Sequence, residues 1–438
     1  MSTVTLASVR IQPDYGSVAR RPPASLEEGH RPKDEVQDFL DGGPAAWLTV
    51  FGAFLALFCS FGQMNAFGTF QSWYTTHQLQ DMDPSAVAWI GSVQLWVFFF
   101  SGGFIGRMFD MYGPRVIMTL GTTVYVASIM LTSVAGAYHE YLLAQGVLSG
   151  LGVGMLFYPP LASISTHFNK YRATALGIAM VGSGLGGTVY PIALQHLFVR
   201  VGFAWGLRVS AIVCFVLCAM ATATVTSRIA PGKVETHERW FNFSALKDSR
   251  FSLLVIGSCF MSLGLFVPFC YIVSYATDHG IDATTAFYVL ALLNLASVIG
   301  RIAPAHFADA FGRFALLVPC AFLAGLSSLV LWSTARTLAQ LLAYAALYGL
   351  FSGAFNALIV PCIAQISDIR EIGMRIGLLY SVISFPSLVG NPAAGALLRV
   401  CNGSYTGLIC MSGVSVMLAS LFMLLSKLKI NPDIFARV

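Results

Sequence analysis

The fold of this chain is decided by two related stretches, each of which follows a long apolar run. The first reads GRMFDMYGPR and occupies residues 106–115, and the second reads FADAFGR and occupies residues 307–313. In both stretches a glycine lies three residues after an aspartate, and the two aspartates, Asp110 and Asp309, are 199 residues apart. A recurrence over such a distance predicts two structurally related halves.

Around these stretches the chain is too apolar for a water-soluble protein. Of its 438 residues, 56% are hydrophobic and 10% are charged, whereas soluble domains average about 25% charged residues. The apolar residues form blocks long enough to cross about 30 Å of hydrocarbon as helices. A β-barrel is excluded because its strands are shorter and alternate in polarity. Twelve blocks lie near residues 46–72, 86–105, 116–136, 141–163, 174–198, 209–226, 251–273, 285–305, 314–334, 338–363, 376–398 and 406–426.

We therefore expect an all-α membrane protein whose twelve transmembrane helices form two six-helix bundles related by a pseudo-two-fold axis. The polar, proline-containing start of the chain has too few apolar residues to bury a core. The longest polar interruption between blocks separates six spans from six. The expected parts are a disordered tail at 1–44, bundles at 45–226 and 251–427, a linker at 227–250 and a second tail at 428–438.

The basic residues predict the orientation in the membrane. Inner loops of membrane proteins carry an excess of Lys and Arg. If both termini are cytoplasmic, nearly all of the 25 basic residues lie inside, and only Arg200, Arg208, Arg336 and Arg399 lie outside. We therefore expect a multi-pass protein of the cell membrane with both termini in the cytoplasm. The formal charge of +5 then belongs to the inner leaflet, and no nucleic-acid partner is expected.

The repeated stretches also carry the residues from which we expect a gate. A glycine permits a tight reversal of the chain, and an aspartate can cap a helix or pair with a basic side chain across the bundle. Two copies at corresponding inner helix ends predict a latch that holds one face closed; the alternative is an ordinary turn. The expected gating residues are Asp110, Gly113, Arg115, Asp309, Gly312 and Arg313.

Arg301 is the one formally charged side chain within the expected spans, and no Asp or Glu lies in those spans to pair with it. Burying a guanidinium in the membrane costs at least about 2.5–3.5 kcal/mol, so such residues usually face a wet cavity or a partner. Because the planar guanidinium binds anions in bidentate geometry, the anionic group of a cargo molecule is one candidate partner. The alternative is that Arg301 reaches the inner surface or bonds backbone carbonyls.

Uncharged polar residues on the spans would complete a binding cavity. Each of them is equally suited to join two helices by a hydrogen bond. His196 is a candidate proton relay, and the alternative is a structural histidine at the outer interface. The expected substrate-binding residues besides Arg301 are Asn65, Gln94, Tyr158, Asn294, Asn356 and Asn391.

Several motifs give the chain a resemblance to a known family. They are DGG at 41–43, WIGSVQ at 89–94, HFNKYRATALG at 167–177, GSGLGG at 182–187 and GNPAAG at 390–395. From residue 41 to about residue 427 the chain resembles transporters of the major facilitator superfamily, and within it the monocarboxylate-transporter-like branch found in fungi. The resemblance implies transport by alternating access.

Two positions depart from the animal lactate carriers of that branch. Those carriers have a lysine in the first span that takes part in proton-coupled transport, and Asn65 stands at its place here. They also have an aspartate one turn before the arginine of the eighth span; Ser297 stands there, while Arg301 is retained. The resemblance therefore does not imply proton-linked lactate or pyruvate transport. It implies a fungal member that exports metabolites or takes up larger molecules.

The sequence thus predicts a secondary or facilitative transporter for a small organic molecule, which we expect to be anionic. An inside-negative potential favours the exit of an anion by about 2.3 kcal/mol per charge per 100 mV, so we expect efflux of a fungal secondary metabolite. The alternative is uptake of a monocarboxylate or a riboflavin-like nutrient, with a proton carried by His196 or by the cargo.

Other function classes fit less well. The spans hold no paired acids or base-activated nucleophile for an enzyme, and no P-loop couples the chain to ATP. Nine cysteines form no CxxC pair, so no metal and no cofactor are expected. A membrane sensor would carry a long signalling tail, and about a dozen residues follow the last span. The expected partners are the lipid bilayer and a small-molecule substrate, with the protein a monomer.

Overall fold

A computed structural model describes residues 41–229 and 243–433. Most of the tails and much of the linker that the sequence predicts lie outside the described residues. Where the predicted boundaries can be compared, the helices begin earlier or run longer: the first begins at Pro44 and the last ends at Ile430. Asp41, which we expected in a disordered tail, already makes hydrogen bonds to the folded part.

The first six spans consist of nine α-helices and one π-helical segment. Spans one, two and four are each divided into shorter pieces, and the others are single helices. The elements are α1 (Pro44–Met64), α2 (Phe67–Thr76), α3 (Pro84–Phe100), α4 (Gly102–Tyr112), α5 (Pro114–Val134), α6 (Tyr138–Tyr141), the π-helix (Leu142–Leu148), α7 (Ser149–His167), α8 (Arg172–Val201) and α9 (Phe203–Thr224).

The last six spans repeat this plan with fewer interruptions. A short 3-10 helix, Phe243–Lys247, precedes them, and another, Ile369–Glu371, precedes α15. The elements are α10 (Ser249–Leu265), α11 (Val267–Asp278), α12 (Ala283–Phe311), α13 (Arg313–Ser327), a π-helix (Ser328–Trp332), α14 (Leu338–Gln365), α15 (Ile372–Val400) and α16 (Thr406–Ile430).

These helices confirm the predicted fold class. In the described residues, eleven helices are long and apolar enough to cross a membrane, and the pair α3 and α4, bent by 41°, makes a twelfth if it is counted as one span. The first and seventh spans are interrupted at corresponding places, near Asn65 and at Phe266. Pro268 lies in the first turn of α11, directly after the second break, a position that suits proline because it needs no backbone donor there. Interrupted spans expose backbone groups where a cavity can use them.

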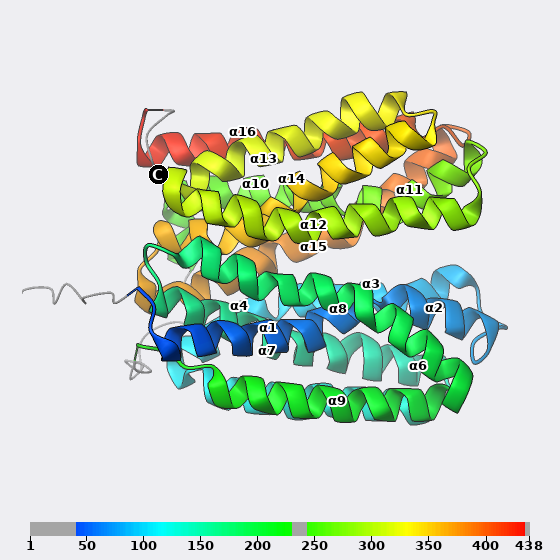
Figure 1. Ribbon diagram of the computed structural model, residues 1–438, viewed down its shortest axis with the longest axis horizontal. Helices are drawn as coiled ribbons and strands as arrows, with labels where there is room; N and C mark the ends of the chain where they lie inside the picture. The colour runs from blue at the N-terminus through cyan, green and yellow to red at the C-terminus, as the bar shows by residue number, and fades with distance from the viewer. Residues whose placement is uncertain (1–40, 230–242, 434–438) are drawn as a thin grey trace, which may run out of the picture. The chain divides into compact units, whose positions relative to one another are not determined.

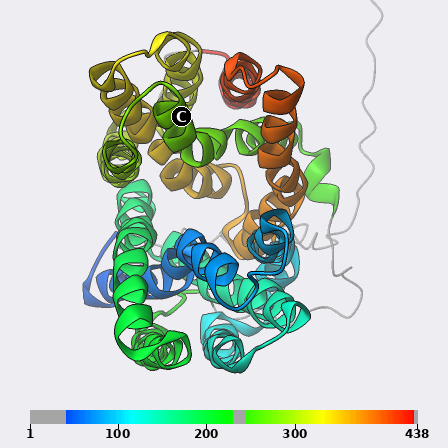
Figure 2. The ribbon, with the colours of Figure 1, turned by 90° about the vertical axis from the view of Figure 1, so that its right-hand side faces the viewer.

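The helices gather into two sets. Helices α1 to α9 pack mainly against one another, and so do α10 to α16. Figure 1 shows the second set above the first, and Figure 2 shows the same two groups end-on. The sets meet through α4 with α15 and through α8 with α12. We call the end of the bundle where α1 begins and α16 ends the terminal end; it lies on the left in Figure 1.

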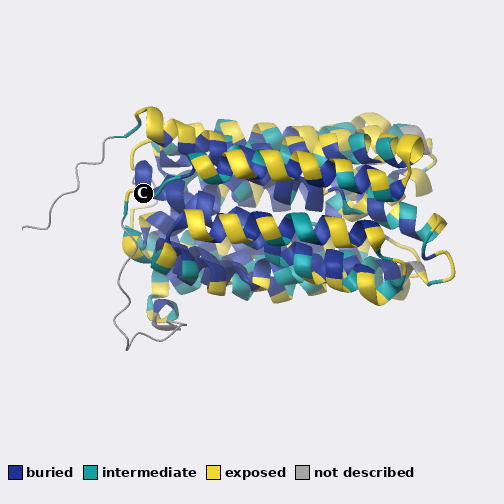
Figure 3. Cartoon of the chain, turned by 90° about the horizontal axis from the view of Figure 1, so that it is seen from below, coloured by how far each residue is buried: buried dark blue, intermediate teal, exposed yellow. Residues whose placement is uncertain are grey.

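Burial follows the membrane pattern. Figure 3 shows buried residues on the inner faces of the helices and exposed residues on the outer faces. Many of the exposed side chains are large and apolar, as a lipid solvent requires; examples are Val199 at 74% and Trp205 at 61%. The helices extend past the predicted spans, and Arg107, Asp110 and Asp309 lie in these extensions.

Candidate functional site

Two aspartates connect the two sets of helices at the terminal end. The carboxylate of Asp110, in α4, accepts hydrogen bonds from the backbone N–H groups of Gly373 (3.1 Å) and Met374 (2.8 Å) at the start of α15. A carboxylate at a helix N-terminus is stabilised by unpaired N–H groups and by the helix dipole. Each aspartate lies in one set and caps a helix of the other set.

Asp309 makes the equivalent contact on the other side. Its carboxylate accepts from the N–H groups of Ala173 (3.0 Å) and Thr174 (2.8 Å) in the first turn of α8, and from the Thr174 hydroxyl at 2.7 Å. Since Asp110 and Asp309 are 199 residues apart, the sequence repeat corresponds to a repeated contact. Capping of a helix start was one of the two contacts expected of these aspartates, and their role in gating stays a prediction.

Small residues bring the helix backbones together below these caps. A Cβ added at Gly377 of α15 would overlap the carbonyl of Gly102 in α4, and one added at Gly177 of α8 would lie 2.5 Å from the carbonyl oxygen of Arg301 in α12. Neither position tolerates a side chain without a shift of backbone. The helix backbones are therefore in close contact both between α4 and α15 and between α8 and α12.

The other predicted gating residues divide into two groups. Gly113 and Gly312 adopt φ values of 75° and 106° at the turns after α4 and α12, a region that favours glycine. Arg313 lies 4.0 Å from Asp309 and donates to the carbonyl of Asn169. Arg115, by contrast, is exposed at the start of α5, and the buried basic residue whose charge interacts with Asp110 is Arg107.

Arg301 lies in α12 where that helix meets α8. Its side chain is 8% exposed, and Nη1 donates to the Ser183 hydroxyl at 2.7 Å and to the carbonyl of Met180 at 3.0 Å. Among the described residues, nothing accepts a hydrogen bond from its buried Nε. The bond to a backbone carbonyl corresponds to the alternative interpretation of this residue, while the unpaired Nε leaves part of the guanidinium fork unsatisfied.

Asn65 lies close to Arg301 because both residues are next to α8. It lies exposed at the break between α1 and α2. A Cβ at Gly187 would lie 3.2 Å from the Cβ of Asn65, and a Cβ at Gly184 would lie 3.1 Å from Nη1 of Arg301. Residues three apart on a helix share a face, so Asn65 and Arg301 lie one turn apart along α8. They form the core of the candidate site.

Gln94 and Tyr158 are placed elsewhere. Gln94 is buried inside the first set, and its amide donates to the Ser149 hydroxyl at 2.9 Å. Tyr158 is 1% exposed, its hydroxyl donates to the carbonyl of Phe98 at 3.0 Å, and its ring centroid lies 5.4 Å from that of Tyr380 in α15. In this conformation both residues make the helix-to-helix contacts that were the alternative to cargo binding.

The remaining predicted residues are dispersed. Asn294 is exposed on α12, where its amide donates to the carbonyl of Leu290. Asn356 is partly buried in α14. Asn391 has a buried Oδ1 with no hydrogen-bond partner in the described part of the chain. His196 is exposed on α8, well along the helix from Arg301.

Two residues near the contact between the sets were missed in the sequence. Ser183 holds Arg301, and the sequence gives no sign of this because small residues pack many helices. Trp96, in α3, has a buried Nε1 without an acceptor among the described residues and stacks on Phe100 at 4.9 Å. A tryptophan in the middle of a span is itself a signal, since its N–H needs a partner.

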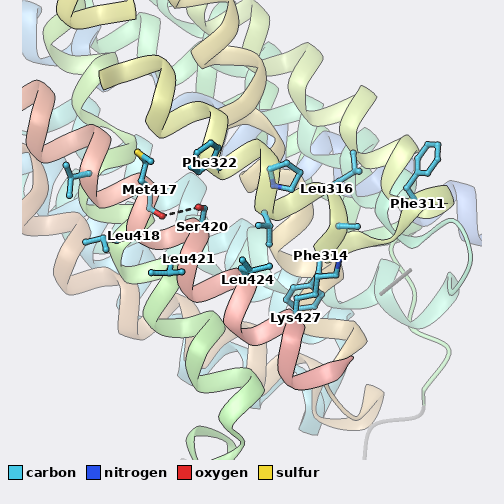
Figure 4. A pocket seen from close by; sticks show the side chains of 14 residues that line it. Phe311, Phe314, Leu316, Phe322, Met417, Leu418, Ser420, Leu421, Leu424 and Lys427 are labelled. Carbon is cyan, nitrogen blue, oxygen red and sulfur yellow. Dashed lines mark hydrogen bonds between the residues drawn. The ribbon is translucent and has the colours of Figure 1, made fainter. Parts of the chain in front are cut away.

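A large groove lies away from this site. It has a volume of about 970 Å³ and runs between α13 and α16, as Figure 4 shows. Its walls are almost wholly apolar, with Phe322 and Leu421 exposed at 41% and 49%, which suits contact with lipid chains. In the described residues there is also no cluster of three or more His, Cys, Asp or Glu side chains that could hold a metal.

Comparisons with known proteins agree with this architecture. Residues 53–335 match the profile of the Major Facilitator Superfamily. The chain is 38% identical over 406 residues to MFS-type transporter 1 of Ophiocordyceps sp., covering 92% of this chain and 90% of that protein. It is 34% identical over 432 residues to the agnestins efflux protein of Paecilomyces divaricatus (98% and 96% covered) and 36% identical over 377 residues to the aspyridones efflux protein of Emericella nidulans (85% and 76% covered).

Solved structures show the same fold at lower sequence identity. The fucose:proton symporter of E. coli superposes with a TM-score of 0.69 at 14% identity, over 87% of this chain and 98% of that one. The human organic anion transporter MFSD10 gives a TM-score of 0.65 at 15% identity, over 86% and 98%. The family match, the close relatives and the fold agree, and the chain belongs to the major facilitator superfamily, whose members are membrane transporters and not enzymes.

Proposed function

We propose that this transporter exports an acidic secondary metabolite from a fungal cell and that Arg301 binds the anionic group of the cargo. The observation that carries the proposal is the Nε of a buried guanidinium, for which the described residues supply no acceptor. Nη1 is held by Ser183 and Met180, so the fork is fixed in direction and a carboxylate or enolate can complete it. Relatives named as efflux proteins for aspyridones and agnestins support the direction and the class of cargo.

The two aspartate caps supply the proposed gate. Asp110 and Asp309 join the first-set and second-set helices at the terminal end, and we assign this end to the cytoplasm because the basic residues concentrate there. The described conformation is then closed towards the cytoplasm. Rocking of residues 45–226 against residues 251–427 would break both caps together and expose the site to the interior. The sequence motifs support a place in the monocarboxylate-transporter-like branch of the family.

Deletion of the gene in the producing fungus tests the proposal even while the cargo is unidentified. Metabolites in mycelium and medium are compared by mass spectrometry. We expect an acidic compound to accumulate inside the deletion strain and to return to the medium when the wild-type gene is restored. Uptake of a monocarboxylate or a riboflavin-like nutrient, the rival function, predicts instead that a compound remains in the medium.

Substitutions at Arg301 test the site. Arg301→Gln should fail to restore export, while Arg301→Lys, which keeps the charge and loses the fork, should restore it in part. Arg399→Gln is the matched control, because Arg399 is exposed at the last turn of α15 and should restore export fully. Full export by Arg301→Gln, in a strain where the protein reaches the membrane in normal amount, would contradict a role for Arg301 in cargo binding.

A further inference from the structure

Asp41 lies just before α1 and is bound to the loop between α7 and α8. One of its carboxylate oxygens accepts hydrogen bonds from the N–H groups of Asn169 and Lys170 at 2.5 and 2.8 Å, and the other accepts from Lys170 at 2.9 Å. These two residues belong to the turn at 168–171, outside both helices. The backbone of the turn is thus fixed by a side chain from the very start of the described chain.

The same turn is held from the other side by the second set. Arg313 donates to the carbonyl oxygen of Asn169, and Asp309 accepts from the N–H groups of Ala173 and Thr174 just beyond the turn. Asn169 is therefore tied through its N–H to Asp41 and through its C=O to Arg313. This one residue connects the start of the first set with the proposed gate of the second.

Packing alone does not fix the turn. Phe168 is buried, and its ring lies 5.2 Å from that of Trp47, edge to face. On the other side, Asn169 and Lys170 border a polar hollow of about 310 Å³ that Asp309 and Arg313 also line. Since no described side chain fills this hollow, hydrogen bonds rather than packing on this side hold the Asn169 carbonyl in its direction.

Local sequence and charge both favour this role for Asp41. Gly42 and Gly43 adopt φ values of 110° and 98°, which other residues rarely adopt, and this bend carries the chain from Asp41 into α1. Arg172 donates to the carbonyl of Phe168 at 2.7 Å. Its charge is attracted by Asp41 and Asp309 and repelled by Arg313. Asp41 thus offsets part of a positive cluster that Asp309 alone does not balance.

We propose that Asp41 is a positioning residue of the gate. By fixing the turn at 168–171, it places the Asn169 carbonyl and the first turn of α8 where Arg313 and Asp309 bind them, and so stabilises the closed cytoplasmic face. When the halves rock, the turn stays with Asp41 and the first set, and only the contacts to Arg313 and Asp309 break. The inference rests on the proposed gate and adds a residue outside the repeated motif.

Hydrogen–deuterium exchange of the full-length protein in lipid nanodiscs tests this inference, because it reports on the amides concerned. A local role for Asp41 would change exchange at Asn169 and Lys170 alone. A gate role requires faster exchange at Gly373 and Met374 as well, since an open gate releases both caps and exchange follows the population of the open state. For Asp41→Asn we expect an increase of about twofold to fivefold at Gly373 and Met374, because the amide still accepts hydrogen bonds but the negative charge near the helix N-terminus is lost.

Two further variants and a control make the result decisive. Asp41→Glu, which keeps the charge on a longer side chain, should give a smaller increase and provides a measurement if Asp41→Asn does not fold. Asp282→Asn removes a similar cap, from the N–H of Thr285 at the opposite end, and should leave Gly373 and Met374 unchanged. Unchanged exchange there in Asp41→Asn, with a rise in Asp309→Asn, would overturn the role of Asp41 and keep the gate. No rise in either variant would overturn the gate itself, and the role of Asp41 with it.

Discussion

Arg301 occupies one of two positions that the repeat makes equivalent. Its counterpart, 199 residues earlier, is Gly102, where a Cβ would lie 2.8 Å from the Tyr158 ring of α7 and 3.1 Å from the carbonyl oxygen of Gly377 in α15. On the α8 side the same position carries a guanidinium whose Nε has no acceptor among the described residues. Under the proposed function, divergence at this single repeated position gives the interface between α8 and α12 a charged group for the cargo, which the interface between α4 and α15 does not have.

A substitution at Ser183 distinguishes the binding of cargo by Arg301 from the positioning of the Arg301 side chain. We expect Ser183→Ala to lower the free energy of unfolding by about 1.5–3 kcal/mol, the range for a hydrogen bond to a charged group, and to retain export, because the Met180 carbonyl still holds Nη1. Thermal unfolding in nanodiscs and metabolite export measure the two effects. If Ser183→Ala abolished export as completely as Arg301→Gln, the serine would itself contact the cargo, contrary to this account.

At the scale of helices, the sequence predicted all twelve spans but not their ends. Apolar blocks locate a span because lipid excludes polar side chains. They do not locate its end, because a helix continues into water wherever its polar residues find partners. Asp110 and Asp309 illustrate this: both follow the predicted ends of their spans, yet both lie in helices, where they cap helices of the other set. Such partners depend on tertiary contacts and cannot be read from hydropathy.

The close packing of α4 against α15 predicts the effect of a substitution at Gly377. A methyl group at position 377 would overlap the Gly102 carbonyl, and overpacking of this kind typically costs about 1–3 kcal/mol. We expect Gly377→Ala to destabilise the closed face and to accelerate exchange at Gly373 and Met374. Gly68→Ala is the control, since a Cβ there meets nothing within 4 Å. Equal exchange in the two variants would show that close packing does not hold the face shut.

At the scale of the whole molecule, the proposed gate couples the two aspartate caps to one motion. Asparagine keeps a hydrogen-bond acceptor, so the double variant Asp110→Asn/Asp309→Asn should lose from the closed state mainly the interaction of each charge with a helix N-terminus, about 0.3–1 kcal/mol per cap. We expect the population open to the cytoplasm to rise. Spin labels on noncanonical residues at exposed positions 115 and 370 leave the native cysteines untouched and should move apart. An unchanged distance distribution would exclude the caps as the gate.

Much of the site could not be predicted from the sequence. Arg301 was identifiable because a charge in an apolar block demands an explanation. The proximity of Arg301 and Asn65 depends on which helices pack against α8. The burial of Gln94 and Tyr158 depends on which face of each helix points into the bundle. Neither is encoded in composition or spacing. The contact of Asp41 with the turn at 168–171 joins residues 128 and 129 positions apart and required the folded chain.

The central claim is that Arg301 carries an organic anion out of the cell without a compensating charge in the membrane. Its most direct test is efflux of the identified metabolite from proteoliposomes at imposed membrane potentials. We predict that an inside-negative potential increases wild-type efflux, with an equilibrium gradient approaching about fiftyfold per 100 mV for one charge, and that Arg301→Gln shows no carrier-dependent efflux. Wild-type efflux that does not change with the potential would contradict the claim.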